Sequence, residues 1–171
     1  MEMLKRLTLI PKVIISKVDG KVIAGGIGLA AASDLVIATP RSQFSLSEAL
    51  WGLLPCSVIP YLIRRVGYQP AYKMTLTTLP ISAIDAYRIH LVDELTDTPD
   101  DSIRKLKPRL IRLSDTTILT MKQYFRKMWL ITEAMEDVAV SEFSKLISQP
   151  TVRENIRNFV EYGQFPWEDK A

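Results

Sequence analysis

The chain has 171 residues, of which 47% are hydrophobic and 24% charged, and its formal net charge is +3. These values predict one globular domain with a buried core and exclude a disordered chain, which needs fewer apolar residues and a larger charge imbalance. The net charge is too small for the dense basic surface of a typical nucleic-acid-binding protein. Cys56 is the single cysteine, so no internal disulfide can form. Without a signal-peptide pattern or a long apolar run, we expect a cytoplasmic protein outside the membrane.

The first part of the chain alternates helical and extended patterns, which is typical of an α/β unit. A β-branched run between Pro11 and Asp19 predicts a buried strand that ends in a turn. The small residues that follow Gly28 favour a helix packed closely against a sheet. The expected elements are a helix (1–9), a strand (13–18), a glycine-rich turn (21–28), a helix (29–32) and two strands (35–38 and 43–45).

Helical patterns dominate after Pro60. Ser82 is an expected N-cap with Asp85 as its acidic partner, and His90 is expected to end that helix in a left-handed conformation. The strands are too few for a stable sheet, so we expect sheet partners upstream or in another chain. We divide the chain into a core (1–95) and a helical C-terminal region (96–171). The expected elements are helices (61–66, 70–77, 82–89), an extended piece (92–95) and further helices (100–113, 115–129, 132–148, 151–161).

Three segments in a fixed order carry a family resemblance. The first, Pro11–Asp34, combines a strand, a glycine-rich loop with A-G-G-I-G, and a helix ending at aspartate. The second, Gln43–Pro55, fits the pattern F-x-x-x-E-x-x-x-G-x-x-P. The third, Ile81–Glu94, fits I-S-A-x-x-A with L-V-D after it. Together they resemble the crotonase (enoyl-CoA hydratase/isomerase) family. The resemblance implies the C-terminal part of its α/β fold, the ClpP/crotonase-like ββα spiral, with the N-terminal third absent.

Within this family, Ser42–Pro55 and Asn155–Trp167 look like the dehydratases of polyketide β-branching cassettes. That likeness implies dehydration of a 3-hydroxy-3-methylglutaryl group on an acyl carrier protein to a 3-methylglutaconyl group. It also implies a lyase without a cofactor, whose substrate is carried on phosphopantetheine of a carrier protein or on CoA. Two alternatives stay open. One is another crotonase reaction, a decarboxylation or isomerisation of an acyl thioester, and the other is a truncated, non-catalytic remnant that binds partners.

The resemblance assigns Gly25 to one of the two oxyanion-hole N–H donors and Glu48 to one of the two catalytic glutamates. The second glutamate position is Gly28 here, which makes ordinary hydration of enoyl-CoA doubtful and leaves Glu48 as general acid/base. By themselves, the glycines equally fit a tight turn, and Glu48 fits a solvated loop carboxylate. Further substrate-binding candidates are Gly26, Gly28, Cys56 and Tyr61. We expect no metal, because no cluster of ligating residues has suitable spacing.

Basic residues offer a second kind of candidate site. Solvated surface is the default reading, and docking of an acidic carrier protein or of a pantetheine phosphate is the functional alternative. The apolar tail that ends at Trp167 is unusual for a free chain end. The family resemblance implies that such C-terminal helices cover the active site or a neighbouring subunit, in a homotrimer or a dimer of trimers. The cations considered are Arg64, Arg65, Arg104, Lys105, Lys107, Arg109, Arg112, Lys122, Arg126 and Lys127.

Overall fold

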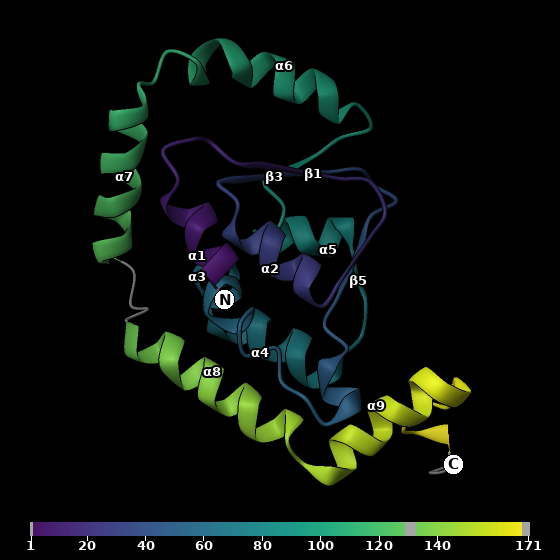
Figure 1. The fold of residues 1–171 in the computed structure, drawn as a ribbon. Helices are drawn as coiled ribbons and strands as arrows, with labels where there is room; N and C mark the ends of the chain where they lie inside the picture. The colour runs from purple at the N-terminus through teal and green to yellow at the C-terminus, as the bar shows by residue number, and fades with distance from the viewer. Residues whose placement is uncertain (1, 129–132, 169–171) are drawn as a thin grey trace.

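The computed structural model describes residues 2–128 and 133–168. Its first part is a mixed α/β core (Figure 1). The strands are β1 (Ile15–Val18), β2 (Lys21–Ile23), β3 (Leu35–Ala38), β4 (Gln43–Ser45), β5 (Ile81–Ser82) and β6 (Glu94–Leu95). The helices between them are α1 (Glu2–Leu9), α2 (Gly25–Ala32), the 3₁₀ helix η1 (Glu48–Trp51), α3 (Ile59–Val66), α4 (Tyr68–Thr77) and α5 (Ala83–Arg88).

The strands form two small sheets. The first has the order β1-β3-β6 and is parallel throughout, with Ile15 opposite Leu35. The second has the order β2-β4-β5, in which β2 and β4 are parallel and β5 is antiparallel. The chain passes from one sheet to the other at Gly20, whose φ of +140° is accessible to glycine alone at low cost. Two strands followed by α2 make one ββα unit, the repeat that the resemblance implies.

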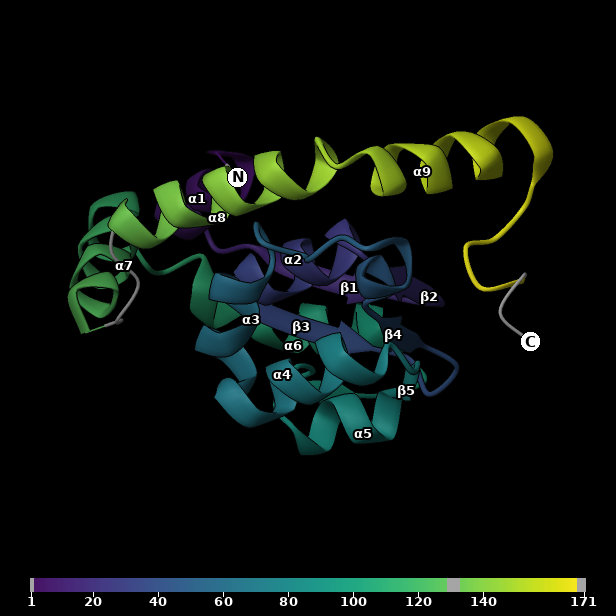
Figure 2. The same ribbon diagram turned by 90° about the horizontal axis from the view of Figure 1, so that it is seen from below.

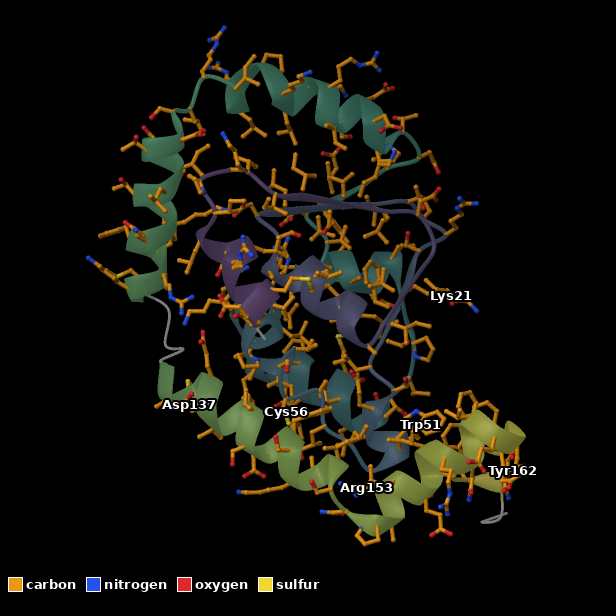
Figure 3. All side chains as sticks on the ribbon, viewed as in Figure 1. Lys21, Trp51, Cys56, Asp137, Arg153 and Tyr162 are labelled. Carbon is orange, nitrogen blue, oxygen red and sulfur yellow. The ribbon has the colours of Figure 1, made fainter. Side chains whose placement is uncertain are left out.

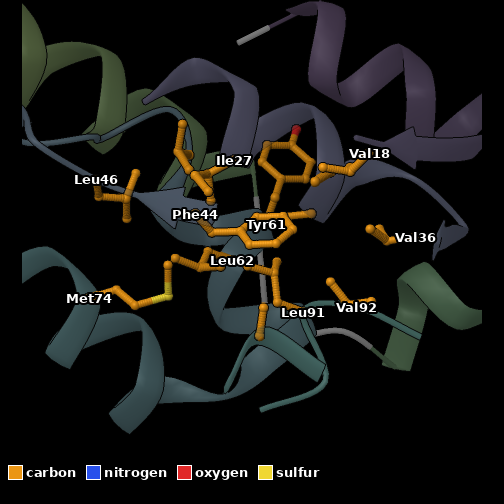
Figure 4. Packing of buried hydrophobic residues seen from close by; sticks show 14 of the residues in the cluster. Val18, Ile27, Val36, Phe44, Leu46, Tyr61, Leu62, Met74, Leu91 and Val92 are labelled. Carbon is orange, nitrogen blue, oxygen red and sulfur yellow. The ribbon is translucent and has the colours of Figure 1, made fainter. Parts of the chain in front are cut away.

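The core lies where α2 and α3 pack together over the sheets (Figure 4). Alanines 30 to 32 of α2 are at most 2% exposed, and their small side chains let α3 approach closely. Phe44 of β4 and Leu62 of α3 are fully buried in the same cluster. The core cluster is therefore formed by residues between Leu4 and Val92.

The second part of the chain is helical. It consists of α6 (Pro99–Leu110), α7 (Asp115–Met128), α8 (Glu133–Ile147) and α9 (Pro150–Tyr162). Helices α8 and α9 run one after the other along the side of the molecule that bears α1 (Figure 2). Few residues of α7, α8 and α9 are buried, among them Ile118, Ala139 and Val152. None of the described helices is both long enough and apolar enough to cross a membrane.

Most of the expected elements are present, with shifted ends. The largest difference is α2, which begins at Gly25, whereas the sequence predicts a turn to Gly28 and a helix from Leu29. Glycine weakens an isolated helix, but here tertiary packing on both sides of α2 stabilises the helix from Gly25 onward. Ser82 caps α5 as expected, since its hydroxyl accepts from the Asp85 N–H, and His90 has a φ of +63°. The expected ends at Trp129 and Thr132 lie outside the described residues.

Candidate active site

The start of α2 exposes backbone donors. By helix geometry, the N–H groups of Gly25 and Gly26 have no intrahelical acceptor. The N-cap residue is Ala24, whose side chain cannot accept a hydrogen bond from them. Ala24 has a φ of +52° and a ψ of −118°, which is a strained conformation for a residue with a Cβ. Such a helix N-terminus stabilises a negative charge that lies close to it. The Gly25 N–H is therefore available to donate to a ligand, and its role in an oxyanion hole stays a prediction.

Strand pairing brings Gly25 and Glu48 to the same edge. Strands β2 and β4 run parallel, with Ile23 opposite Ser45, and the Ala24 N–H donates to the Ser45 carbonyl at 3.0 Å. The chain then enters α2 two residues after Ile23 and η1 three residues after Ser45. Parallel strands end on the same side of a sheet, so the N-terminus of α2 and the first residue of η1 emerge together.

Glu48 is half-buried at the beginning of η1. Burial raises the pKa of its carboxyl above the ordinary 4.5, and hydrogen bonds from the backbone N–H groups of Glu48 and Ser47 oppose that rise. Its Oε2 is buried and has no hydrogen-bond partner among the described residues. A carboxyl with a raised pKa and an oxygen left without a protein partner is suited to exchanging a proton with a ligand.

Gly28 is a place of close packing. A Cβ at this position would lie 3.0 Å from Leu4 Cδ1 and 3.0 Å from Val58 Cγ2. Leu4 and Val58 thus fill the space in which a second glutamate side chain would begin. Gly26 is similarly close to Val22, at 3.1 Å. These two glycines therefore allow close packing around α2, and their role in binding substrate stays a prediction.

The other two candidates, Cys56 and Tyr61, point into the protein. Cys56 is 7% exposed, and burial raises the pKa of its thiol, which disfavours the reactive thiolate. It lies towards α8 (Figure 3). Tyr61 is 2% exposed within the core, and burial together with the charge of Glu136 raises the pKa of its hydroxyl. Neither Cys56 nor Tyr61 is therefore an exposed polar group that could act on a ligand beside Glu48.

Several cations that the sequence leaves as surface candidates are bound within the fold. Lys122 of α7 pairs with Asp34 at 2.8 Å and also donates to two backbone carbonyls of the α1–β1 segment. Arg65 donates to the carbonyls of Ser33 and Leu91 and to the Asp93 carboxylate. The reading of these side chains as solvated surface is wrong, because residues distant in sequence enclose them. Arg64 and Arg126 likewise bond to Ala31 and Glu136.

The C-terminal segment covers η1, which sequence reasoning did not foresee in detail. The rings of Trp51 and Phe159 lie 4.9 Å apart at an interplanar angle of 74°. Trp51 lies next to α9 in Figure 3. No local pattern around Trp51 predicts this contact, because its partner is about a hundred residues away in the chain. Trp51 is the residue near the site that the sequence analysis missed.

Open surface hollows occur elsewhere. One of about 370 Å³ lies at the α8–α9 elbow, and one of about 310 Å³ lies along α1. Neither is lined by Gly25 or Glu48. Among residues 2–128 and 133–168, no group of three or more His, Cys, Asp or Glu side chains is placed to hold a metal ion. The lining of the first hollow is Ile147, Arg153, Ile156, Arg157, Val160 and Glu161.

Comparison with known proteins identifies the family. The sequence model described as enoyl-CoA hydratase/isomerase matches residues 1–170. The chain belongs to the enoyl-CoA hydratase/isomerase family. The family resemblance drawn from the three sequence segments is confirmed, and with it the crotonase fold.

Relatives in this family are longer than the chain. The bacillaene synthase dehydratase PksH of Bacillus subtilis (strain 168) is 42% identical over 160 residues, which cover 94% of this chain and 62% of that protein. The mevalonyl-coenzyme A hydratase sidH of Aspergillus fumigatus is 28% identical, over 91% of this chain and 60% of that protein. The chain therefore spans about three-fifths of the length of these curated relatives.

Solved structures of family members have the same fold. The crystal structure of a polyketide biosynthesis enoyl-CoA hydratase from Bacillus subtilis matches with a TM-score of 0.91 at 39% identity, covering 96% of this chain and 66% of that one. An enoyl-CoA hydratase from Mycobacterium avium matches with a TM-score of 0.83 at 27% identity, over 96% of this chain and 66% of that one.

Proposed function

We propose that the protein takes part in polyketide biosynthesis as a dehydratase, removing water from a 3-hydroxy-3-methylglutaryl group held as a thioester on an acyl carrier protein. The observation that carries this proposal is the placement of one half-buried carboxyl, Glu48, at the same sheet edge as the donors of Gly25. Similarity to the dehydratase PksH supports the reaction class.

The proposed reaction needs one proton carrier. The Glu48 carboxylate removes a proton from C2 of the acyl group, and negative charge builds up on the thioester oxygen. The Gly25 N–H donates to that oxygen, aided by the α2 dipole. Glu48, now protonated, gives the proton to the hydroxyl on C3, and the C–O bond breaks to release water. A C2=C3 double bond remains, so atoms and electrons balance without a redox cofactor.

With glycine at position 28, the proposed elimination depends on Glu48 as its proton carrier. Hydration of a simple enoyl thioester in this family uses two glutamates around one water, and Leu4 and Val58 occupy the second place here. The raised pKa of Glu48 favours the protonated state that must deliver a proton to the leaving hydroxyl. The second oxyanion donor, by family resemblance, comes from a segment upstream of this chain. Loss of one such donor typically costs about 2.7–4 kcal/mol in the transition state.

Mass spectrometry of the loaded carrier protein tests the proposal. The 3-hydroxy-3-methylglutaryl carrier protein is incubated with this chain and, separately, with a version extended upstream in its gene. We expect the extended version to remove one water, and Glu48→Gln in that version to abolish the loss. Glu154→Gln, on the exposed face of α9, is the matched control and should keep full turnover. The same assay with the CoA thioester distinguishes the two carriers.

Two outcomes contradict the proposal in different ways. If neither version removes water, another reaction of the family, a decarboxylation or isomerisation, takes its place. If the extended version removes water and Glu48→Gln leaves that turnover unchanged, Glu48 is not the proton carrier; a chain that binds the carrier protein but turns over no acyl thioester is a non-catalytic remnant. A homotrimer or a dimer of trimers is part of the same proposal, and sedimentation of the extended protein measures it.

A further inference from the structure

Four aromatic rings meet over η1, and we call them the aromatic clasp. One ring comes from η1 itself and the other three come from α9 and the segment after it. The members of the clasp are Trp51, Phe159, Phe165 and Trp167.

We propose that Trp51 is a positioning residue for Glu48, held in place by the C-terminal rings of the aromatic clasp. The inference rests on the proposed function, because it assigns Trp51 a role through the carboxyl that exchanges the proton. Trp51 itself is not assigned any contact with the substrate. The C-terminal segment thereby becomes part of the active-site wall of the same chain.

The first step concerns the geometry of η1. Glu48 is the first of its four residues and Trp51 the last. In a 3₁₀ helix the side chains at i and i+3 lie above one another, so a restraint on the Trp51 ring acts on the turn that orients Glu48. The backbone of this turn is closed by hydrogen bonds from Leu50 to Ser47 and from Leu53 to Glu48, both at 3.1 Å.

The second step is that η1 has little burial of its own. None of its four residues is buried, and no side chain caps it at Ser47. A short 3₁₀ turn without a cap or a buried side chain is a weak element by itself. Its order therefore depends on the elements that pack on it, which include α4 of the core and α9.

The clasp supplies that packing. The Trp51 ring lies 4.9 Å from Phe159, 5.7 Å from Trp167 and 6.1 Å from Phe165, centroid to centroid. The angles of 74° to Phe159 and to Trp167 are the edge-to-face arrangement that aromatic pairs prefer. The rings also contact one another, with Phe165 at 5.0 Å from Phe159 and 4.9 Å from Trp167. These three aromatic neighbours restrain the orientation of the Trp51 ring.

A second contact fixes the end of the turn. Gly52 ends η1 with a φ of +77°, and Val152 Cγ2 of α9 lies 3.0 Å from the place where a Cβ would stand. Val152 is itself buried at 2% exposure. Helix α9 thus contacts η1 at its last residue, Trp51, and at Gly52, which follows it.

Amide hydrogen exchange tests the clasp without any substrate. Trp51→Leu and Phe165→Leu are compared with the unaltered chain, and Tyr162→Leu is the matched control, because Tyr162 is 74% exposed and lies outside the clasp. Each of the first two variants removes three ring pairs, which together correspond to roughly a tenfold change or more in the local opening equilibrium. We expect exchange of residues 46–55 to rise by about that factor in the first two variants only. The conservative Trp51→Phe should restore most of the protection.

Turnover of the extended protein gives the second measurement. Trp51→Leu should lower kcat about tenfold with little change in KM, since the substrate contacts stay and the Glu48 geometry loosens. Unchanged exchange of residues 46–55 in both clasp variants, or an equal rise in Tyr162→Leu, overturns the inference. Raised exchange with no turnover in any version retains the clasp and removes the proposed function.

Discussion

At Glu48, two local effects on the carboxyl oppose each other. Burial favours the neutral acid, whereas backbone N–H groups favour the carboxylate, and burial is the larger effect. The folded-state pKa therefore lies above the unfolded-state pKa. Between these two values the native protein binds more protons than the unfolded chain. Stability consequently falls as the pH rises through this window, the reverse of the usual behaviour of a salt-bridged carboxylate.

The raised pKa of Glu48 leads to a prediction for Glu48→Gln that needs no activity assay. Glutamine cannot ionise, so the variant should gain unfolding free energy relative to the unaltered chain as the pH rises above 4.5. Urea unfolding of both proteins between pH 4 and pH 8, roughly the range in which globular proteins are most stable, measures the difference. Glu154→Gln, at an exposed position of α9, is the matched control. A difference that is constant with pH would contradict the burial of the Glu48 carboxyl.

The elements are joined by buried cations rather than by apolar faces alone. Lys122 has a side chain only 9% exposed and connects α7 with the ends of α1 and α2 through Leu7, Lys12 and Asp34. Asp34 also accepts from the Ile14 N–H at 2.7 Å. A charge enclosed in this way is costly to leave without its partner, so it determines where α7 lies.

Replacement of the buried lysine should loosen α7. Lys122→Met keeps the aliphatic stem and removes the charge, so Asp34 and two carbonyls lose their donor. We expect a loss of about 3 kcal/mol in unfolding free energy, the lower end for breaking a buried ion pair, because Asp34 is partly exposed. Urea denaturation measures it. Lys127→Met, exposed on the same helix, should change stability by less than about 0.5 kcal/mol.

For the molecule as a whole, the α8–α9 arm and the α/β core are held together at few places. Besides the aromatic clasp, Glu136 of α8 accepts from Lys5 of α1 and from Arg126 of α7, both at 3.1 Å. Its side chain is 14% exposed. Much of the apolar surface of α8 remains exposed, so this polar junction carries a large share of the attachment.

Glu136→Gln should therefore release the arm while the core stays folded. Hydrogen bonds to charged groups are typically worth about 1.5–3 kcal/mol, so exchange along α8 should rise by roughly tenfold or more. Exchange in β1 and β3 should remain as it was. Glu142→Gln is the control, because Glu142 pairs only with the exposed Lys145 of the same helix in the described residues. Equal loss of protection in arm and core would mean that they unfold as one unit.

The sequence by itself determined the family and most of the order of the elements. Glycines, β-branched runs and caps act locally. The Ser82 cap, the left-handed His90 and the strand before Asp19 can therefore be predicted from residues nearby in the chain. The family resemblance assigns the roles of Gly25 and Glu48, which stay predictions, and both residues lie within three residues of a strand end.

Only the tertiary structure decided which charges are internal and what covers the site. Lys122 and Arg65 resemble surface cations in sequence, and their acceptors lie 26 to 115 residues away. Gly28 shows its packing role only once Leu4 and Val58 close around it. Trp51 acquires its partners from the far end of the chain. Burial is a property of contacts between distant segments, and a local pattern does not contain it.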